Sequence, residues 1–151
     1  MQQGSALPRP TNDEYYTAMV SLVASRGTCA RRSVGCILVD KTNRVLSTGF
    51  NGVAPGMAHC VDFPCEAAGA PSGSSLHLCR ASHAEQAALL HCSDVMKIAT
   101  AYVTTSPCND CTKLLLMTSC QRIVFLDEYP HAMAKIWWLE ARREWFHFIG
   151  K

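Results

Sequence analysis

The sequence lacks several features that would place it in a broad class of protein. No apolar run approaches the length of a membrane span, which argues against a transmembrane helix. Charged residues are sparse at 17%, and the net charge is +2. This balance argues against an extended basic surface for nucleic acid, but it is compatible with a local phosphate-binding pocket. There is no internal repeat, and the 151 residues suit one compact domain, 1–151.

The first residues also lack the basic and apolar regions of a signal peptide, and 1–10 are expected to form a loose leader. The expected compartment is therefore the reducing cytosol. Cysteines there serve as metal ligands or small buried hydrophobes more often than as disulfides. The nine cysteines are an odd number, so complete pairing within the chain is excluded.

What the sequence does have is an alternation of helical and strand patterns, with 48% hydrophobic residues to form a core. A helix is expected from Thr11 or Asn12 to about Arg26, and its predicted apolar side consists of Tyr15, Met19, Leu22 and Val23. The other predicted elements are strands at 33–40, 44–50, 100–106 and 122–128, helices at 84–92, 108–119 and 131–144, and a last short strand in WFHFI.

This order of elements predicts parallel, buried strands with crossover helices in a three-layer α/β/α domain. In the last helix, the period is marked by Ile136, Leu139 and Arg143. The segment 51–79 is expected to be a long loop rich in glycine, proline, serine and cysteine. A structureless loop of that length is unusual in a small domain and is typical of a functional or metal-bound segment.

Two motifs, HAEQAALL at 83–90 and SPCNDC at 106–111, each begin a predicted helix. Cys108 and Cys111 are three positions apart, so on a helix both sulfurs can reach one metal ion. His83 and Glu85 are two positions apart and share no helical face, so His83 must lie at the helix entrance. At the second motif, we expect Ser106 as the N-cap and Pro107 at the first helical position.

One histidine and two cysteines leave the fourth position of a tetrahedral zinc site open, which is typical of catalytic zinc. Zinc lowers the pKa of bound water, and a nearby glutamate can then transfer protons. The pattern H-x-E with P-C-x-x-C is the signature of zinc nucleobase deaminases. Each motif alone is weak, but together they indicate catalytic zinc, with a purely structural zinc as the alternative.

With these motifs, the stretches SRGTCARRSVGCILV, TGFNG and IVFLDEY make the chain from about Glu14 to Tyr129 resemble the cytidine deaminase superfamily. Within it, the chain is similar to the deoxycytidylate (dCMP) deaminases of bacteria and phages. The resemblance implies a mixed five-stranded sheet flanked by helices, and hydrolysis of dCMP to dUMP and ammonia for thymidylate synthesis. It also implies a hexamer activated by dCTP and inhibited by dTTP, with Mg²⁺ accompanying the triphosphate.

The resemblance also implies roles for individual residues. Zinc would be held by His83, Cys108 and Cys111, and Glu85 would protonate the base at N3 and pass a proton to the leaving ammonia. The base edge would contact the backbone at Ala84 and around Ser106 and Pro107. The sugar hydroxyl would be held by Asn51, and Tyr129 would approach the substrate from its strand end. A plain turn for Asn51 and a packing role for Tyr129 are the alternatives.

The phosphate of a nucleotide needs donors, and guanidinium groups suit phosphate oxygens. Arg26, Arg31 and Arg32 precede the predicted strand at 33–40. We expect at least one of them, with Arg26 assigned to substrate, to contact a phosphate. A solvated basic turn is the alternative. By resemblance, an effector site would lie near Arg32, Val34 and Gly52 at a subunit boundary.

The other cysteines suggest a second, structural zinc, as in related bacterial and phage enzymes. The predicted ligands are Cys29, Cys60, Cys65 and Cys79, with His77 as a substitute, and the alternative is free thiols. The remaining cysteines, Cys36, Cys92 and Cys120, are expected in the core.

Three other functions stay open at this point. A polynucleotide or tRNA deaminase would need a basic or aromatic track, whereas the aromatic cluster Trp137, Trp138, Trp145, Phe146 and Phe148 has the spacing of core or interface residues. A free-cytidine deaminase would need no phosphate. A non-catalytic, zinc-bound interaction module would have no use for Glu85. We expect no nucleic-acid or membrane partner, and one of the adjacent tryptophans to face a second copy of the chain.

Overall fold

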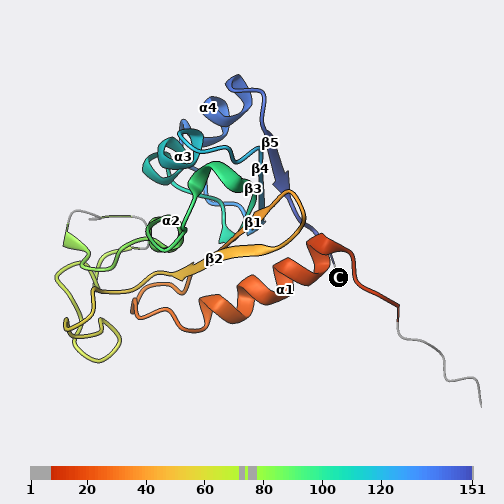
Figure 1. Ribbon diagram of the computed structural model, residues 1–151. Helices are drawn as coiled ribbons and strands as arrows, with labels where there is room; N and C mark the ends of the chain where they lie inside the picture. Colours follow the sequence, from red (N-terminus) through yellow and green to blue (C-terminus); the bar gives the residue numbers. More distant parts are fainter. Residues whose placement is uncertain (1–7, 72–73, 75–77, 151) are drawn as a thin grey trace, which may run out of the picture.

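The computed structural model describes residues 8–71, 74 and 78–150. It contains a mixed five-stranded sheet in the order β2-β1-β3-β4-β5, which confirms the expected sheet (Figure 1). β1 is antiparallel to β2 and β3, whereas β3, β4 and β5 are parallel. The strands are β1 (Gly35–Asp40), β2 (Val45–Phe50), β3 (Ile98–Thr105), β4 (Arg122–Asp127) and β5 (Glu144–His147).

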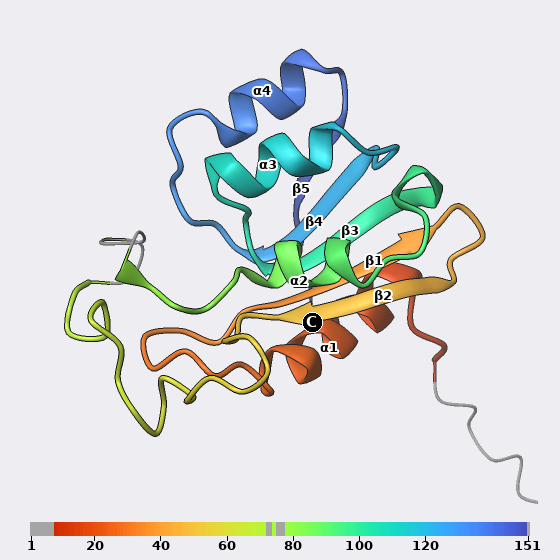
Figure 2. The same ribbon diagram turned by 60° about the vertical axis from the view of Figure 1, so that its left-hand side comes forward.

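Helices cover both faces of this sheet, as Figure 2 shows, so the predicted three layers are present. Helix α1 (Asn12–Ala24) packs on one face. The other face is covered by α2 (Ala84–Leu90), α3 (Asn109–Leu116) and α4 (Ala134–Glu140). A short 3-10 helix, η2 (Val95–Lys97), precedes β3. Among the described helices, none has the length and apolar character needed to cross a bilayer.

The sheet is parallel where helices connect its strands, because a strand that returns through a crossover helix runs in the same direction as the first. By contrast, β1 and β2 are joined by a tight turn, in which Asn43 adopts a left-handed φ of 61°. The central strands β1, β3 and β4 are buried on both faces, which explains their continuous apolar runs.

Helix α1 begins as expected, because Thr11 and Glu14 form a capping box. The prediction of its apolar side was half right, since Met19 and Val23 are partly buried against the core. Its buried residues are Tyr16, Thr17, Val20 and Ala24, whereas Tyr15 and Leu22 are 48% and 73% exposed. Tyr16 and Val20 are one turn apart and pack on Ile37 and Val39 of β1, so the sheet selects a face rotated from the most apolar one.

The face predicted for the last helix was wrong. Ile136 and Leu139 are 56% and 49% exposed, whereas Trp138 is fully buried in the core. Arg143 follows the helix, and its guanidinium donates to four carbonyl oxygens at the end of α3 and in the following turn, those of Leu115, Leu116, Thr118 and Cys120. Arg143 therefore provides hydrogen-bond donors to the carbonyl groups at the C-terminal end of α3 and is not part of an apolar face of α4. Trp137 is half-buried.

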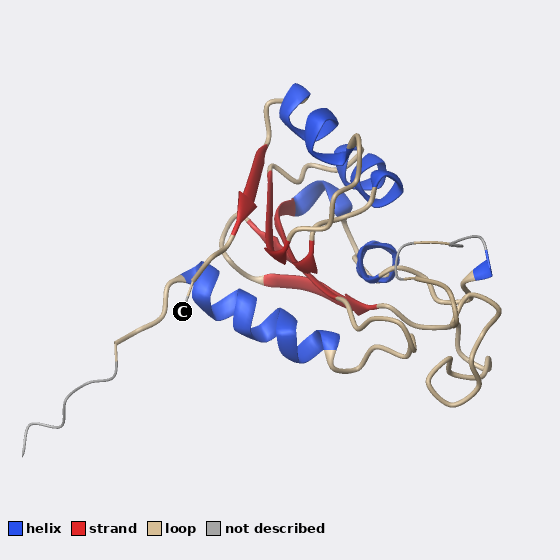
Figure 3. Cartoon of the chain, turned by 180° about the vertical axis from the view of Figure 1, so that it is seen from behind, coloured by secondary structure: helices blue, strands red, loops and turns tan. Residues whose placement is uncertain are grey.

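The three cysteines expected in the core are mostly there: Cys36 and Cys120 are fully buried and Cys92 is partly buried. The loop after β2 connects to α2 and projects beyond the sheet (Figure 3). Its described part contains turns, a 3-10 position at Leu78, one bridge between Gly52 and Ser82, and no longer element.

A polar link joins α1 to the sheet. The Asp13 carboxylate accepts two hydrogen bonds from the Arg122 guanidinium, both 2.7 Å, and one from the Tyr102 hydroxyl at 2.8 Å. Hydrogen bonding to Arg122 holds the pKa of Asp13 below its usual value. Because the folded-state pKa is depressed, this link stabilises the fold above the unfolded pKa and is lost as the pH falls through the folded one.

We expect Asp13→Asn to lower the free energy of unfolding at pH 7 by about 1–2 kcal/mol, because one partner of a charged, partly buried pair is removed. The difference from wild type should shrink as the pH falls below about 3.8, where the unfolded Asp13 itself becomes protonated. Chemical denaturation of both proteins at pH 7 and at a pH below 3.8 measures this difference. The exposed Asp62→Asn is the control, and a difference independent of pH would contradict the ionic link.

Candidate active site

The residue that begins α2 has the conformation that the sequence required of it. His83 is the N-cap, with extended backbone angles of φ −71° and ψ 154°, and Ala84 is the first helical residue. The His83 N–H donates to the Gln86 side chain at 2.9 Å. Because His83 lies outside the regular helix, its ring and the Glu85 side chain line the same pocket despite their spacing of two.

The start of α3 differs from the prediction. Cys108 is the N-cap, and its sulfur accepts from the Cys111 N–H at 3.4 Å, so the helix begins at Asn109 and neither Ser106 nor Pro107 is part of its cap. The Ser106 hydroxyl instead contacts the backbone of Tyr129, accepting from its N–H at 2.7 Å and donating to its carbonyl at 3.0 Å. A thiolate that can accept from backbone N–H groups replaces the hydroxyl cap.

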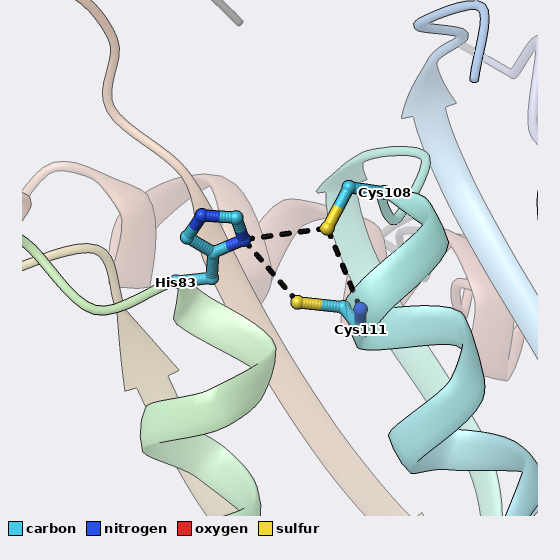
Figure 4. Close-up of side chains that lie close together, drawn as sticks. All are labelled: His83, Cys108 and Cys111. Atoms are coloured by element: carbon cyan, nitrogen blue, oxygen red, sulfur yellow. Dashed lines mark hydrogen bonds between the residues drawn. The ribbon is translucent and has the colours of Figure 1, made fainter. Parts of the chain in front are cut away.

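The two helix starts bring three candidate zinc ligands together (Figure 4). His83 Nδ1 is 3.4 Å from Cys108 Sγ and 3.3 Å from Cys111 Sγ. Tetrahedral zinc with ordinary Zn–N and Zn–S bonds requires N···S separations of about 3.6 Å, so this donor set fits the ion. Within the ranges that the structure describes, this is the one group of three or more metal-ligating side chains so closely gathered.

The electrostatics of this group suit a metal site. The Cys111 thiol and the His83 ring both hydrogen-bond to Cys108 and lower the pKa of that thiol to about 4, which favours a thiolate. Interaction with Cys108, followed by burial, raises the pKa of Cys111, so the second thiolate needs a cation to form. Glu85 is only 4% exposed, and burial raises the pKa of its carboxyl.

A pocket surrounds these residues and contains most of the predicted site. It is lined by the catalytic candidates, by Asn51 and by Tyr129. Arg32 and Val34 also line it, although they were predicted to belong to an effector site. The full lining is Cys29, Arg31, Arg32, Val34, Asn51, Cys79, Ala81, Ser82, His83, Ala84, Glu85, Thr105, Ser106, Cys108, Tyr129 and His131.

Some predicted residues lie elsewhere. Arg26 lines a separate hollow, together with Thr28, Phe50 and His59. Gly52 is buried beside the pocket and exchanges two backbone hydrogen bonds with Ser82. Asn51 lines the pocket, and its amide also holds the backbone: Nδ2 donates to the Arg32 carbonyl at 2.6 Å, and Oδ1 accepts from the Val34 N–H at 2.8 Å. The second Nδ2 hydrogen remains available for a further bond.

Sequence reasoning missed His131 as a lining residue. Its ring centroid lies 4.8 Å from that of Tyr129, just after the carboxyl end of β4. The available signal was its position, because residues that follow the carboxyl ends of parallel strands gather at one edge of the sheet.

Helix α2 needs an unusually close approach to β2 to present its first residues at this pocket. A Cβ atom at Gly49 would lie 2.3 Å from the Ala84 carbonyl oxygen and 2.4 Å from the Ala88 nitrogen. The neighbouring Ser47 hydroxyl donates to the Ala88 carbonyl at 2.7 Å. Gly49 therefore sets how closely the helix that carries His83 and Glu85 packs on the sheet.

Comparison with known proteins agrees with this geometry. The model of the cytidine and deoxycytidylate deaminase zinc-binding region matches residues 10–127. The chain belongs to the cytidine and deoxycytidylate deaminase family. The matched region contains the whole His83, Cys108 and Cys111 group.

Individual relatives in the family are similar over most of this chain. The deoxycytidylate deaminase of Mycobacterium phage D29 is 38% identical over 128 residues, covering 81% of this chain and 99% of the phage protein. That of Saccharomyces cerevisiae is 34% identical over 130 residues, but the chain spans 41% of its length. The fold is similar to that of the dCMP deaminase from cyanophage S-TIM5 in complex with dCMP and dUMP. That structure has a TM-score of 0.74 and 24% identity, over 94% of this chain and all of that one.

Gly49→Ala is expected to displace α2, because backbone atoms that meet the new Cβ have no room to move. The free energy of unfolding should fall by about 1–3 kcal/mol or more, and zinc content should fall with it. Denaturation and elemental analysis measure the two effects. Gly69→Ala, where an added Cβ meets nothing within 4 Å, is the matched control. Full zinc content and stability in the Gly49 variant would contradict this packing argument.

Proposed function

We propose that this chain is a zinc-dependent dCMP deaminase that hydrolyses dCMP to dUMP and ammonia for thymidylate precursor synthesis. The observation that carries the proposal is the group of His83, Cys108 and Cys111, of which His83 and Cys108 line one pocket with the buried Glu85. The names of the phage and yeast relatives support the choice of dCMP among cytosine compounds.

Zinc bound by His83, Cys108 and Cys111 would lower the pKa of a water molecule at the open fourth position and make it nucleophilic near neutral pH. Glu85 is two residues from His83 in the sequence and lines the same pocket. Its carboxylate would accept one proton from the attacking water and give it to N3 of the base as the C4–O bond forms. It would then move the remaining hydroxyl proton to the 4-amino group, so that the C4–N bond breaks and ammonia leaves.

The backbone at the base-binding end is suited to orient the pyrimidine. Ala84 occupies the first helical position of α2, where the N–H has no partner within the helix and can donate to the base. Ser106 is fixed by its two hydrogen bonds to Tyr129, so the chain around Ser106 and Pro107 presents a rigid edge. Fixed donors and acceptors at both edges would hold C4 near the attacking water.

Regulation and assembly belong to the same proposal. We infer activation by dCTP and inhibition by dTTP, each bound with Mg²⁺, in a hexamer, on the ground of the resemblance to regulated dCMP deaminases. Since a thiolate zinc site favours a reducing compartment, we also infer a cytoplasmic location. No part of this proposal requires a nucleic-acid or membrane partner.

Ammonia release tests the substrate. We expect turnover of dCMP to exceed that of CMP, deoxycytidine and a short cytosine-containing DNA strand, with rates changed by dCTP and dTTP in the presence of Mg²⁺. Glu85→Gln should reduce kcat by at least about a hundredfold, because proton transfer is lost, while zinc stays bound. Gln86→Glu, at the neighbouring helical position, is the control. A fully active Glu85→Gln enzyme, or turnover of DNA alone, would contradict the proposal.

We also propose that the loop after β2 binds a second, structural zinc through Cys29, Cys60, Cys65 and Cys79. Cys60 and Cys65 lie with their sulfurs 3.6 Å apart in a small buried cluster, and Cys79 packs against it. A backbone hydrogen bond from Ala67 lowers the pKa of Cys65, which favours its thiolate. Cys29 and Cys79 both line the active-site pocket. The substitute ligand His77 lies outside the described residues.

Elemental analysis of the purified protein should give about two zinc ions per chain. Cys60→Ser should lower this by about one and reduce thermal stability, because the loop has little other regular structure to hold it. Cys92→Ser is the control and should leave the zinc content at the wild-type value. One zinc per chain in the wild type would contradict the second site.

A further inference from the structure

Three arginines were candidates to bind the substrate phosphate, and their surroundings differ. Arg26 is exposed and lies in a hollow away from the pocket that contains Glu85. Arg31 lines the pocket, but its Nη1 donates to the carbonyls of Pro71 and Ser74, at 2.9 and 2.6 Å, and so ties the segment to the long loop. Arg32 lines the pocket without such a tie.

The Arg32 guanidinium is stacked on an aromatic ring. Its Cζ lies 5.1 Å from the centroid of the Tyr129 ring. Among the residues that the structure describes, its guanidinium makes no hydrogen bond and no ion pair. A guanidinium stacked in this way keeps its N–H groups in its own plane, where they can form two parallel bonds to an oxyanion.

Side chains of the same pocket hold the backbone on both sides of this stack, at Arg32 and at Tyr129. The Ser106 hydroxyl fixes the Tyr129 backbone through both its N–H and its carbonyl. The Asn51 amide fixes the backbone of the arginine segment through the Arg32 carbonyl and the Val34 N–H. The Arg32 side chain therefore extends from a fixed backbone and stacks on a tyrosine whose backbone is also fixed. This lowers the conformational entropy lost when a ligand binds.

The charge of the pocket favours an anion. Arg31 and Arg32 carry permanent positive charges, whereas Glu85 is the one carboxyl group among the lining residues and is buried at the catalytic end. A nucleotide that directs its base toward Glu85 would thus place its phosphate in a positive region.

We propose that Arg32 binds the substrate phosphate on the Tyr129 ring, and that Asn51 is a positioning residue that holds the Arg32 segment. This inference rests on the proposed function and names the group that would distinguish a nucleotide from a nucleoside. It assigns Arg32 to the substrate pocket, where the resemblance had suggested an effector site, and it gives the Asn51 amide a second role beside the sugar contact that the resemblance implied.

Calorimetry with dUMP and deoxyuridine tests the arginine without depending on turnover. The wild-type zinc-loaded protein should bind dUMP more tightly than deoxyuridine, and Arg32→Gln should reduce this preference by about tenfold or more. Arg26→Gln, in the separate hollow, is the matched control and should keep the preference. Loss of the preference in this control, with Arg32→Gln keeping it, would overturn the assignment, as would a wild-type protein without any preference.

Asn51→Asp and Asn51→Ala test the positioning role. The carboxylate variant keeps an acceptor for the Val34 N–H but loses the donor to the Arg32 carbonyl, and the alanine variant loses both. Each should therefore weaken dUMP binding more than deoxyuridine binding. In the dCMP assay, KM should rise more than kcat falls. Equal weakening of dUMP and deoxyuridine would mean that the amide acts only through the sugar, and would overturn the positioning role.

The two proposals fail in different ways. A protein that binds dUMP through Arg32 but releases no ammonia from any cytosine compound would contradict the deaminase activity and support the phosphate assignment. A protein that deaminates dCMP and deoxycytidine equally well, before and after Arg32→Gln, would support the deaminase chemistry and overturn the phosphate assignment.

Discussion

The rest of this structure depends on bringing two helix N-termini together over the edge of one sheet. A tetrahedral zinc ion tolerates ligand positions that differ by only a few tenths of an ångström, and the three candidate ligands come from the starts of α2 and α3. These helices begin 25 residues apart in the sequence, at the N-caps His83 and Cys108. The sheet must therefore hold both helices rigidly. Gly49, where β2 meets α2 without room for a side chain, shows how closely α2 packs on the sheet.

Helix N-termini suit this task for electrostatic reasons. Their unpaired N–H groups and positive dipole ends stabilise thiolates, and Cys108 serves at once as the N-cap of α3 and as a candidate ligand. The same feature places Glu85 inside the first turn of α2, where the carboxyl is buried beside the ligands. One local geometry thus brings together the candidate metal ligands, the buried carboxyl of Glu85 and the N–H of Ala84.

The opposite end of the pocket is built from weaker and more distant contacts. Arg32 comes from the segment before β1, Tyr129 from the end of β4, and Ser106 from the end of β3. They meet because the ends of β3 and β4 lie side by side in the parallel part of the sheet. Specificity for a substrate can change in this region through a few loop residues, while the zinc chemistry stays with the rigid helices.

The sequence alone predicted the elements well, because hydrophobic periodicity and turn residues are local signals. It did not predict which face of a helix would be buried. In α1 and α4, the sheet buries Val20 and Trp138 and leaves Leu22 and Ile136 exposed. Several faces of these helices are apolar enough to pack, so the fit to the sheet and not the composition decides between them.

By itself, the sequence singled out the candidate metal ligands and Glu85, because the spacing of these residues permits few other uses. Only the tertiary structure decided that Cys108, and not Ser106, caps α3, and that Arg26 lies apart from the pocket that Arg32 lines. The physical reason is the distance along the chain over which each kind of interaction acts. Motif chemistry depends on neighbours along the chain, whereas a pocket is formed by side chains from segments far apart in the sequence, whose positions follow from packing.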